Sequence, residues 1–220
     1  MSLTPAFAPT SLAGPALQGL LLCGSLIVAI GAQNAFLLRQ GLRREHVAPL
    51  VLACSLADAL LIALGVAGLA GLLGARPQLA QAMAAAGVLF LLAYGLRALW
   101  QARKPSTLQA AQGSSLSLRA ALLQLAGFTL LNPHVYLDTV LLMGSVGAQQ
   151  TSGAARAAFV VGASSASLIW FTGLGFGARK LAPLFAKPRA WQVFDALIGA
   201  VMLLMAWQLL PLAAGGHLAP

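Results

Sequence analysis

Six long apolar stretches, separated by short polar segments, constrain the fold of this sequence more than any other feature. A transmembrane helix needs about 20 mostly apolar residues to cross a hydrocarbon core about 30 Å thick. The stretches that reach this length are residues 15–38, 47–74, 79–100, 120–148, 155–178 and 190–212. We therefore expect an all-α integral membrane protein with six transmembrane helices that contact membrane lipid.

The composition excludes most soluble classes of protein. Only 8% of the 220 residues are charged and 60% are hydrophobic, whereas soluble domains carry about 25% charged residues. This balance excludes a cytosolic enzyme, a disordered chain and a small disulfide-stabilised secreted domain. The two cysteines, Cys23 and Cys54, lie in apolar stretches and are predicted to be free thiols. The first residues lack the basic segment of a cleaved signal peptide.

The net charge of +9 is explained by membrane topology. An excess of basic residues often indicates nucleic acid as a partner, but this excess occurs in an apolar chain, and we expect no nucleic-acid partner. With six spans, the first, third and fifth connections share one side, which holds 11 of the 13 basic residues. These are Arg39, Arg43, Arg44, Arg97, Arg103, Lys104, Arg119, Arg179, Lys180, Lys187 and Arg189. Basic residues near span ends mark the cytoplasmic side, so a multi-pass membrane protein with both termini outside is predicted.

We expect one membrane domain over residues 1–220, which a polar linker divides into two halves. The parts are residues 1–100, the cytoplasmic linker 101–119 and residues 120–220. Two groups of three spans joined in this way have opposite topology, as in transporters built from inverted repeats. The third and sixth spans also match at an offset of 112, for example at Gly87 and Gly199. We predict two inverted three-helix repeats.

Glycines in the fifth span indicate close helix packing. Gly173 and Gly177 have the GxxxG spacing that lets two helix backbones approach each other. We expect the pair to pack helices within one bundle, and a homodimer contact is the alternative.

Three of the four acidic residues lie within predicted spans, where a charged side chain is costly and usually faces a cavity or a partner. Asp58 is about halfway through the second span. We expect it to line a site, because no basic residue is predicted at that depth; a structural ion pair with an arginine is the alternative. Asp195, near the start of the sixth span, is expected to snorkel to the membrane surface or to pair with Lys187 or Arg189.

The fourth span contains the polar segment NPHVYLDTV, residues 132–140. Pro133 removes a backbone donor and clashes with the preceding turn, so the helix should break near Asn132. The polar side chains are Asn132, His134, Tyr136, Asp138 and Thr139. They occupy two nearly opposite faces of a helix, which therefore cannot face lipid on either. The pattern predicts a broken helix that lines a substrate site.

Two amides and two hydroxyls complete the candidates. Gln33 and Asn34, near the end of the first span, need hydrogen-bond partners at membrane depth or contact a substrate. Ser164 and Ser165, in the fifth span, are weaker candidates because serines in membrane helices often serve packing.

Cofactor and enzyme chemistry are not expected. His134 and Asp138 are spaced like two metal ligands on one helix, but Cys23 and Cys54 do not extend the pair, so no metal site is predicted. The serines lie in Ala/Gly-rich helices without a nucleophile elbow, which argues against a hydrolase.

Four segments carry a resemblance to a known family. They are GAQNAFLLRQGLRRE (31–45), CSLADALLI (54–62), NPHVYLDTVLLMGSVGAQ (132–149) and ASLIWFTGLGFG (166–177). They resemble the LysE-type basic amino acid exporters, in particular the arginine-exporter branch, over about residues 17–210. The resemblance implies export of L-arginine or L-lysine from a bacterial cytoplasm, driven by an ion gradient or the membrane potential. One departure is Ala32 where the family pattern has proline, which weakens the expectation of a broken first helix.

The candidate residues suit a cationic amino acid. Asp58 and Asp138 can bind its cationic groups, because a guanidinium makes bidentate contacts to carboxylates. Backbone N–H groups freed at the break in span four, with Gln33 and Asn34, can bind its carboxylate. One aspartate is alternatively the carrier of a coupling proton. The predicted substrate-binding set is Asp58, Asp138, Asn34, Gln33, Asn132, Tyr136 and His134, with Ser164, Ser165 and Thr139 as weaker members.

Three other functions stay open. An exporter of neutral amino acids would not need two intramembrane aspartates. An exporter of a small metal cation would prefer more carboxylates, thiols or histidines at one depth. A non-transporting membrane subunit gives no reason for polar residues at the centre of the spans.

Overall fold

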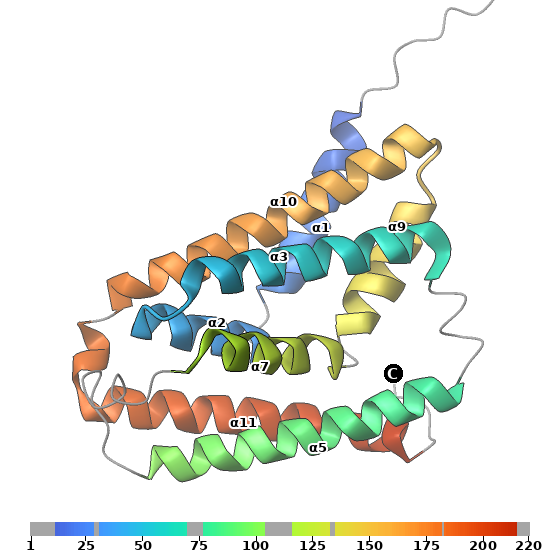
Figure 1. The fold of residues 1–220 in the computed structure, drawn as a ribbon. Coiled ribbons are helices and arrows are strands. Elements are labelled where there is room, and N and C mark those ends of the chain that lie inside the picture. The colour runs from blue at the N-terminus through green and yellow to red at the C-terminus, as the bar shows by residue number, and fades with distance from the viewer. Residues whose placement is uncertain are drawn as a thin grey trace, which may run out of the picture.

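A computed structural model describes residues 12–28, 31–69, 77–103, 116–132, 135–181 and 183–214, and its regular elements within these ranges are all helical (Figure 1). The α-helices are α1 (Ala13–Ile27), α2 (Ala32–Arg43), α3 (Val47–Leu64), α5 (Pro77–Ala102), α7 (Leu118–Leu130), α9 (Met143–Ala148), α10 (Gly153–Gly177) and α11 (Pro188–Ala213). Two π-helical segments, η1 (Gly65–Leu69) and η2 (Tyr136–Leu142), and two 3-10 turns, η3 (Ala178–Leu181) and η4 (Leu184–Ala186), complete the described elements.

Within the described residues, four helices are long and apolar enough to cross a membrane. They cover Val47–Gly68, Ala84–Ala102, Gly153–Leu181 and Arg189–Pro211. The bent pair α1 and α2 makes a fifth if it is counted as one span. The all-helical membrane class is therefore confirmed, and α7, η2 and α9 are shorter apolar pieces in the region of the fourth predicted span.

The first predicted span is broken. Helix α1 ends at Ile27, α2 begins at Ala32, and their axes differ by 81°. The expectation that Ala32, in place of proline, weakens this break was wrong. A side chain bridges the break, because the Asn34 amide donates to the Ile27 carbonyl at 2.8 Å. That bond satisfies one of the carbonyls that a helix end leaves without an intrahelical partner.

The fourth predicted span is also broken, as Pro133 predicts. Helix α7 ends at Leu130, and η2 begins at Tyr136. Pro133 and His134 lie outside the described residues, and the two flanking elements fix the break around Asn132. The continuation starts as a π-helix and becomes α-helical at Met143.

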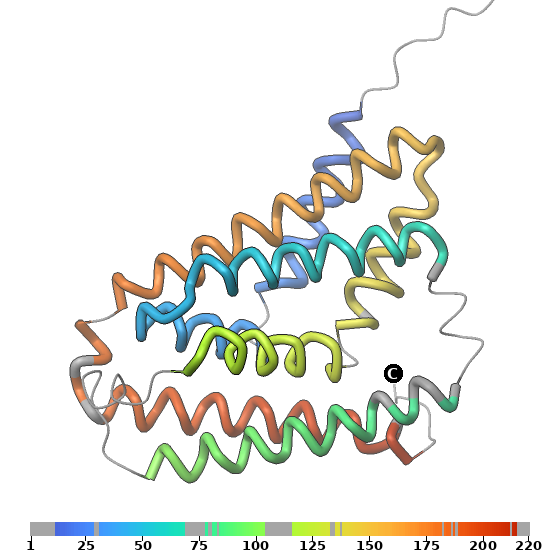
Figure 2. The backbone as a smooth tube through the Cα atoms, viewed as in Figure 1, coloured from blue at the N-terminus to red at the C-terminus, as the bar shows by residue number. Residues whose placement is uncertain are grey.

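The long helices pack in pairs through glycines. Helix α1 lies against α10, and α5 lies beside α11 (Figures 1 and 2). A Cβ on Gly162 would lie 1.9 Å from the Ala16 carbonyl oxygen, and a Cβ on Gly65 would lie 2.6 Å from that of Val140. These glycines are therefore required for the close approach of two backbones.

The predicted role of Gly173 and Gly177 in packing the bundle was wrong. A Cβ at either position would meet no described atom within 4 Å. The glycine of this segment that contacts a neighbour is Gly175, where a Cβ would lie 2.9 Å from the Val51 side chain.

Two expectations about charged residues also need correction. Residue 39 was assigned to a loop over 39–46, but α2 continues to Arg43 and carries Arg39 into the bundle. Asp195 was expected to pair with Lys187 or Arg189, but Arg39 Nη1 lies 3.2 Å from Asp195 Oδ1 instead. The cause of both errors is the same, because the longer helix brings Arg39 beside α11.

Candidate functional site

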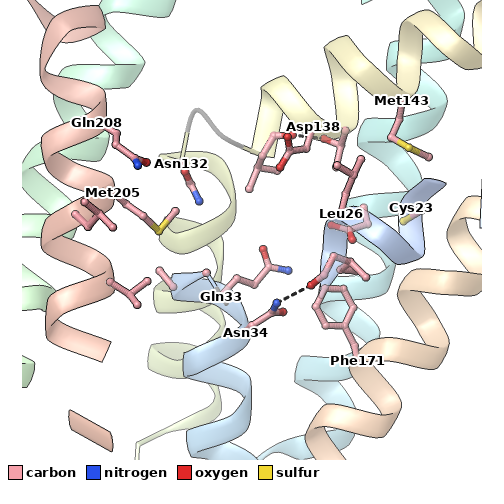
Figure 3. A pocket seen from close by; sticks show the side chains of 18 residues that line it. Cys23, Leu26, Gln33, Asn34, Asn132, Asp138, Met143, Phe171, Met205 and Gln208 are labelled. Carbon is pink, nitrogen blue, oxygen red and sulfur yellow. Dashed lines mark hydrogen bonds between the residues drawn. The ribbon is translucent and has the colours of Figure 1, made fainter. Parts of the chain in front are cut away.

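A cavity of about 370 Å³ lies where the two broken spans face each other (Figure 3). It is lined by Cys23, Leu26, Ile27, Gly31, Ala32, Gln33, Asn34, Asp58, Asn132, Val135, Asp138, Thr139, Met143, Phe171, Val201, Leu204, Met205 and Gln208. The wall comes from both sides of each break, with α3, α10 and α11 closing the rest. The polar part of this wall is concentrated at the breaks.

Six of the predicted site residues line the cavity. They are Gln33, Asn34, Asp58, Asn132, Asp138 and Thr139. Figure 3 shows the Gln33 and Asn34 side chains on α2 between Asn132 on one side and Asp138 on the other. Residues from three predicted spans therefore meet at one place.

Of the other predicted residues, Tyr136, Ser164 and Ser165 do not line the cavity. The Tyr136 hydroxyl donates to the Leu130 carbonyl at 3.0 Å, across the break in the fourth span. Ser165 donates to the Val161 carbonyl of its own helix at 2.8 Å, and neither Ser164 nor Ser165 lines the cavity. His134 lies outside the described residues, so its predicted role in binding stays a prediction.

Asp58 is buried, with 6% of its surface exposed. The Ser167 hydroxyl, on α10, donates to Asp58 Oδ2 at 2.8 Å, and Cys23 Sγ lies 3.4 Å from the same hydroxyl. Within the described ranges the structure gives Asp58 no ion pair with a basic side chain. The alternative of a structural Asp58–arginine pair therefore finds no support among these residues.

Both amides of the first span are engaged in the fold. Gln33 Oε1 accepts a hydrogen bond from the Thr129 hydroxyl at 3.0 Å, which joins α2 to α7. Asn34 donates to the Ile27 carbonyl and accepts from Trp170 Nε1 at 3.3 Å. Their side chains hold the half-helices in place and at the same time form part of the cavity wall.

The charged groups of the lining are acidic. Asp58 and Asp138 are its two carboxylates, and no arginine or lysine is present among the described lining residues. Arg39, further along α2, is engaged with Asp195 and donates to Gln101 Oε1 at 2.9 Å. The buried Asp58 carboxylate, which has no ion pair with a basic side chain among the described residues, favours a cationic ligand in this low-dielectric wall.

Several residues of the wall, and one that supports it, were not in the predicted set. Gln208 and Met205 enter the wall from α11, and Ser167 contacts Asp58 from α10. Gln208 is a polar residue inside a predicted span, which is the signal that could have identified it. Ser167 was outside the predicted set, because the position of a serine in a helix does not show which neighbouring helix it faces.

Metal ligation finds no counterpart in the described part of the chain. No group of three or more histidine, cysteine, aspartate or glutamate side chains is placed there to hold a metal ion.

Comparison with known proteins gives the family. The sequence profile described as "LysE type translocator" matches residues 24–212. An arginine exporter protein, ArgO, of Klebsiella pneumoniae is 39% identical over 193 residues, which cover 87% of this chain and 91% of the relative. Candidate amino-acid transporters of Mycobacterium tuberculosis and Aeromonas salmonicida are 44% and 42% identical, over 81% and 92% of this chain and 88% and 97% of their own lengths. No solved structure matches the chain. With a family match over most of its length and relatives of this similarity, the chain belongs to the LysE-type translocators.

Proposed function

We propose that this protein exports basic L-amino acids, arginine and also lysine, from the bacterial cytoplasm across the inner membrane. The observation that carries the proposal is the cavity at the two helix breaks, whose charged lining consists of Asp58 and Asp138. Relatives named as arginine exporters support the choice of substrate.

The two carboxylates suit the two cationic groups of such a substrate. Arginine presents a guanidinium and an α-ammonium, and lysine presents two ammonium groups. A guanidinium makes paired hydrogen bonds to a carboxylate, and both cations gain from leaving water only where a negative partner compensates. We assign one cationic group to Asp58 and the other to Asp138.

The substrate carboxylate is assigned to the start of α2. A helix begins with backbone N–H groups that have no intrahelical acceptor, and its dipole favours a negative charge there. Gly31 and Ala32, at this end of α2, line the cavity together with Gln33 and Asn34. A cavity with carboxylates on one side and a helix N-terminus on another is suited to a zwitterionic ligand with an additional positive charge.

Six spans in two inverted repeats remain our proposal for the architecture. Each half would contain one broken span and two long helices, α1–α2, α3 and α5 in the first and α7–α9, α10 and α11 in the second. The packing supports this correspondence, because α1 and α2 contact α10 just as α9 and α7 contact α3 and its π-helical extension. The remaining pair, α5 and α11, contact each other.

The direction of transport and its energy source follow from the charge of the substrate. Outward movement of one positive charge against a potential negative inside costs about 2.3 kcal/mol per 100 mV. We propose that exchange for an external proton, or a high internal concentration of substrate, offsets this cost. The segregation of basic residues supports an orientation with the connections after α2, α5 and η3 in the cytoplasm and both termini outside.

The test is efflux of radiolabelled arginine and lysine from preloaded cells. Asp58→Asn and Asp138→Asn are expected to abolish efflux while the protein stays in the membrane at the normal amount. Glu45→Gln is the matched control, because it removes a carboxylate that bonds to Arg43 away from the cavity. Normal efflux from both aspartate variants would refute the site, and efflux of homoserine in place of arginine would favour a neutral amino acid as substrate. An uncoupler that leaves arginine efflux unchanged would contradict proton exchange.

A further inference from the structure

Ser167 differs from Ser55 and Ser165, two other serines of the long helices, in the partner of its hydroxyl. Ser55 and Ser165 donate to the carbonyl four residues earlier on their own helix, at 2.9 and 2.8 Å. This back-bonding is the usual choice of a serine within a helix, because the acceptor is always nearby. Ser167 instead donates across the interface between α10 and α3 to a side chain 109 positions away, Asp58 Oδ2.

The contact lies in a fully enclosed place. Ser167 has no exposed surface and Asp58 has 6%. Within the described ranges, the Ser167 hydroxyl is the one side-chain donor that reaches the Asp58 carboxylate. A hydrogen bond to a charged acceptor in such surroundings is stronger than one between neutral groups, and it fixes the direction of the carboxylate.

The serine has no contact with the cavity itself. Asp58 is part of the cavity wall and Ser167 is not. The effect of Ser167 on a ligand must therefore act through Asp58 or through the packing of α10. Cys23, whose thiol lies 3.4 Å from the Ser167 hydroxyl, approaches from α1, so three helices meet at this group.

We infer that Ser167 is a positioning residue for substrate recognition: its hydroxyl holds the Asp58 carboxylate in the orientation that receives the cationic group of a basic amino acid. The inference rests on the proposed function, because it assigns Asp58 to the substrate. With Oδ2 held by the serine, the carboxylate does not have to be reoriented when the ligand arrives, and the binding site is organised in advance.

The test measures binding of radiolabelled arginine to the purified full-length protein in detergent, together with efflux from cells. Ser167→Ala is expected to raise the Kd and the KM by about 10-fold or more, with the maximal rate changed by less than about 2-fold. Ser167→Thr, which keeps the hydroxyl, is expected to restore most of the affinity. Ser165→Ala is the matched control on the same helix, because it removes a hydroxyl that bonds to its own backbone, and it should leave both constants unchanged.

Removal of the carboxylate separates a positioning role from packing. In the Asp58→Asn background, Ser167→Ala should weaken arginine binding no further, because the group that it positions is gone. The inference would be overturned if Ser167→Ala weakened arginine binding in the Asp58→Asn background as much as it does in the wild type. It would also be overturned if Ser167→Ala bound arginine with the wild-type Kd while Asp58→Asn had lost binding. The second outcome leaves the proposed function standing. Wild-type affinity of Asp58→Asn would refute the proposed site and this inference with it.

A second substitution covers the case in which Ser167→Ala does not yield folded protein. Ser167→Cys is close in size, and its thiol is a weaker donor. It is expected to raise the Kd by about 3-fold or more, and an unchanged Kd would overturn the inference.

Discussion

The Arg39–Asp195 pair offers a quantitative test of how α2 is anchored in the bundle. Arg39 Nη1 lies 3.2 Å from Asp195 Oδ1, with 23% of the arginine side chain and 2% of the aspartate side chain exposed. Gln101 on α5 accepts a further hydrogen bond from Arg39, and the guanidinium carbon lies 5.9 Å from the ring centroid of Trp191. The pair therefore joins α2 to both α5 and α11.

Loss of the arginine leaves a carboxylate buried without its cation. We expect Arg39→Met to lower the free energy of unfolding by about 3–5 kcal/mol, the usual cost of breaking a buried pair by removing one partner. For a chain of this size, a change of 1 kcal/mol in the free energy of unfolding shifts the thermal unfolding midpoint by about 2–4 °C, so the midpoint of Arg39→Met should fall by about 6–20 °C. The double variant Arg39→Met/Asp195→Leu should recover to within about 1 kcal/mol of the wild type, because an apolar pair of similar volume replaces both charges.

The assay is thermal unfolding of the purified protein in detergent, followed by tryptophan fluorescence. Arg156→Met is the control, because Arg156 is exposed and bonds only to the Gln150 carbonyl in the described structure, and its midpoint should stay near that of the wild type. The reasoning is refuted if Arg39→Met unfolds within about 2 °C of the wild type, or if the double variant is no more stable than the single one.

Two further predictions concern packing and the cavity. Gly162→Ala should lower the unfolding midpoint, because its Cβ would lie 1.9 Å from a backbone oxygen of α1. Gly173→Ala has open space and should raise the free energy of unfolding by about 0.5–1 kcal/mol. Thermal unfolding measures both variants, and midpoint shifts of the same sign would contradict the helix contacts. Cys23 lines the cavity, whereas Cys54 has no exposed surface and is not among the lining residues, so a small thiol reagent should modify Cys23 first. Saturating arginine should slow that reaction. Mass spectrometry gives the modification rates of the two cysteines. A Cys23 rate that saturating arginine leaves unchanged would indicate that the substrate binds elsewhere.

Much of the fold could be predicted because hydropathy and proline act locally. The predicted spans over 79–100, 155–178 and 190–212 agree with α5, α10 and α11 to within a few residues. The break in the fourth span was predicted from Pro133, for a reason that depends only on the ring of proline. The break in the first span was not predicted with the same force, because no proline marks it. The hydrogen bond from the Asn34 amide to the Ile27 carbonyl, which bridges the break, is visible only in the structure.

The partners of polar side chains could not be predicted in the same way. Asp58 and Ser167 are 109 positions apart, and their contact depends on how α3 and α10 cross. Asp195 has basic residues within a few positions in the sequence, but its partner is Arg39, because α2 packs against α11. Position within a span indicates that a polar group needs a partner, and only the packing of helices determines which one.

The contrast between two buried aspartates bears on how a cation can be both bound and released. Asp195 is paired with Arg39 at 3.2 Å, so a guanidinium of the protein itself compensates its charge permanently. Asp58 accepts one hydrogen bond from the Ser167 hydroxyl and borders the cavity. A single neutral donor orients a carboxylate but compensates less of its charge than a cation does. On the proposed function, the guanidinium of the substrate supplies to Asp58 what Arg39 supplies to Asp195, and because it is not tethered to the chain, it can leave on the other side of the membrane.

The same comparison predicts that an arginine introduced at Gln208, which lines the cavity from α11, would block export by acting as a tethered substrate. Efflux of lysine and arginine from cells that carry Gln208→Arg, with Gln208→Met as the uncharged control, measures this directly, and normal efflux from the arginine variant would contradict a cation-binding role of the cavity.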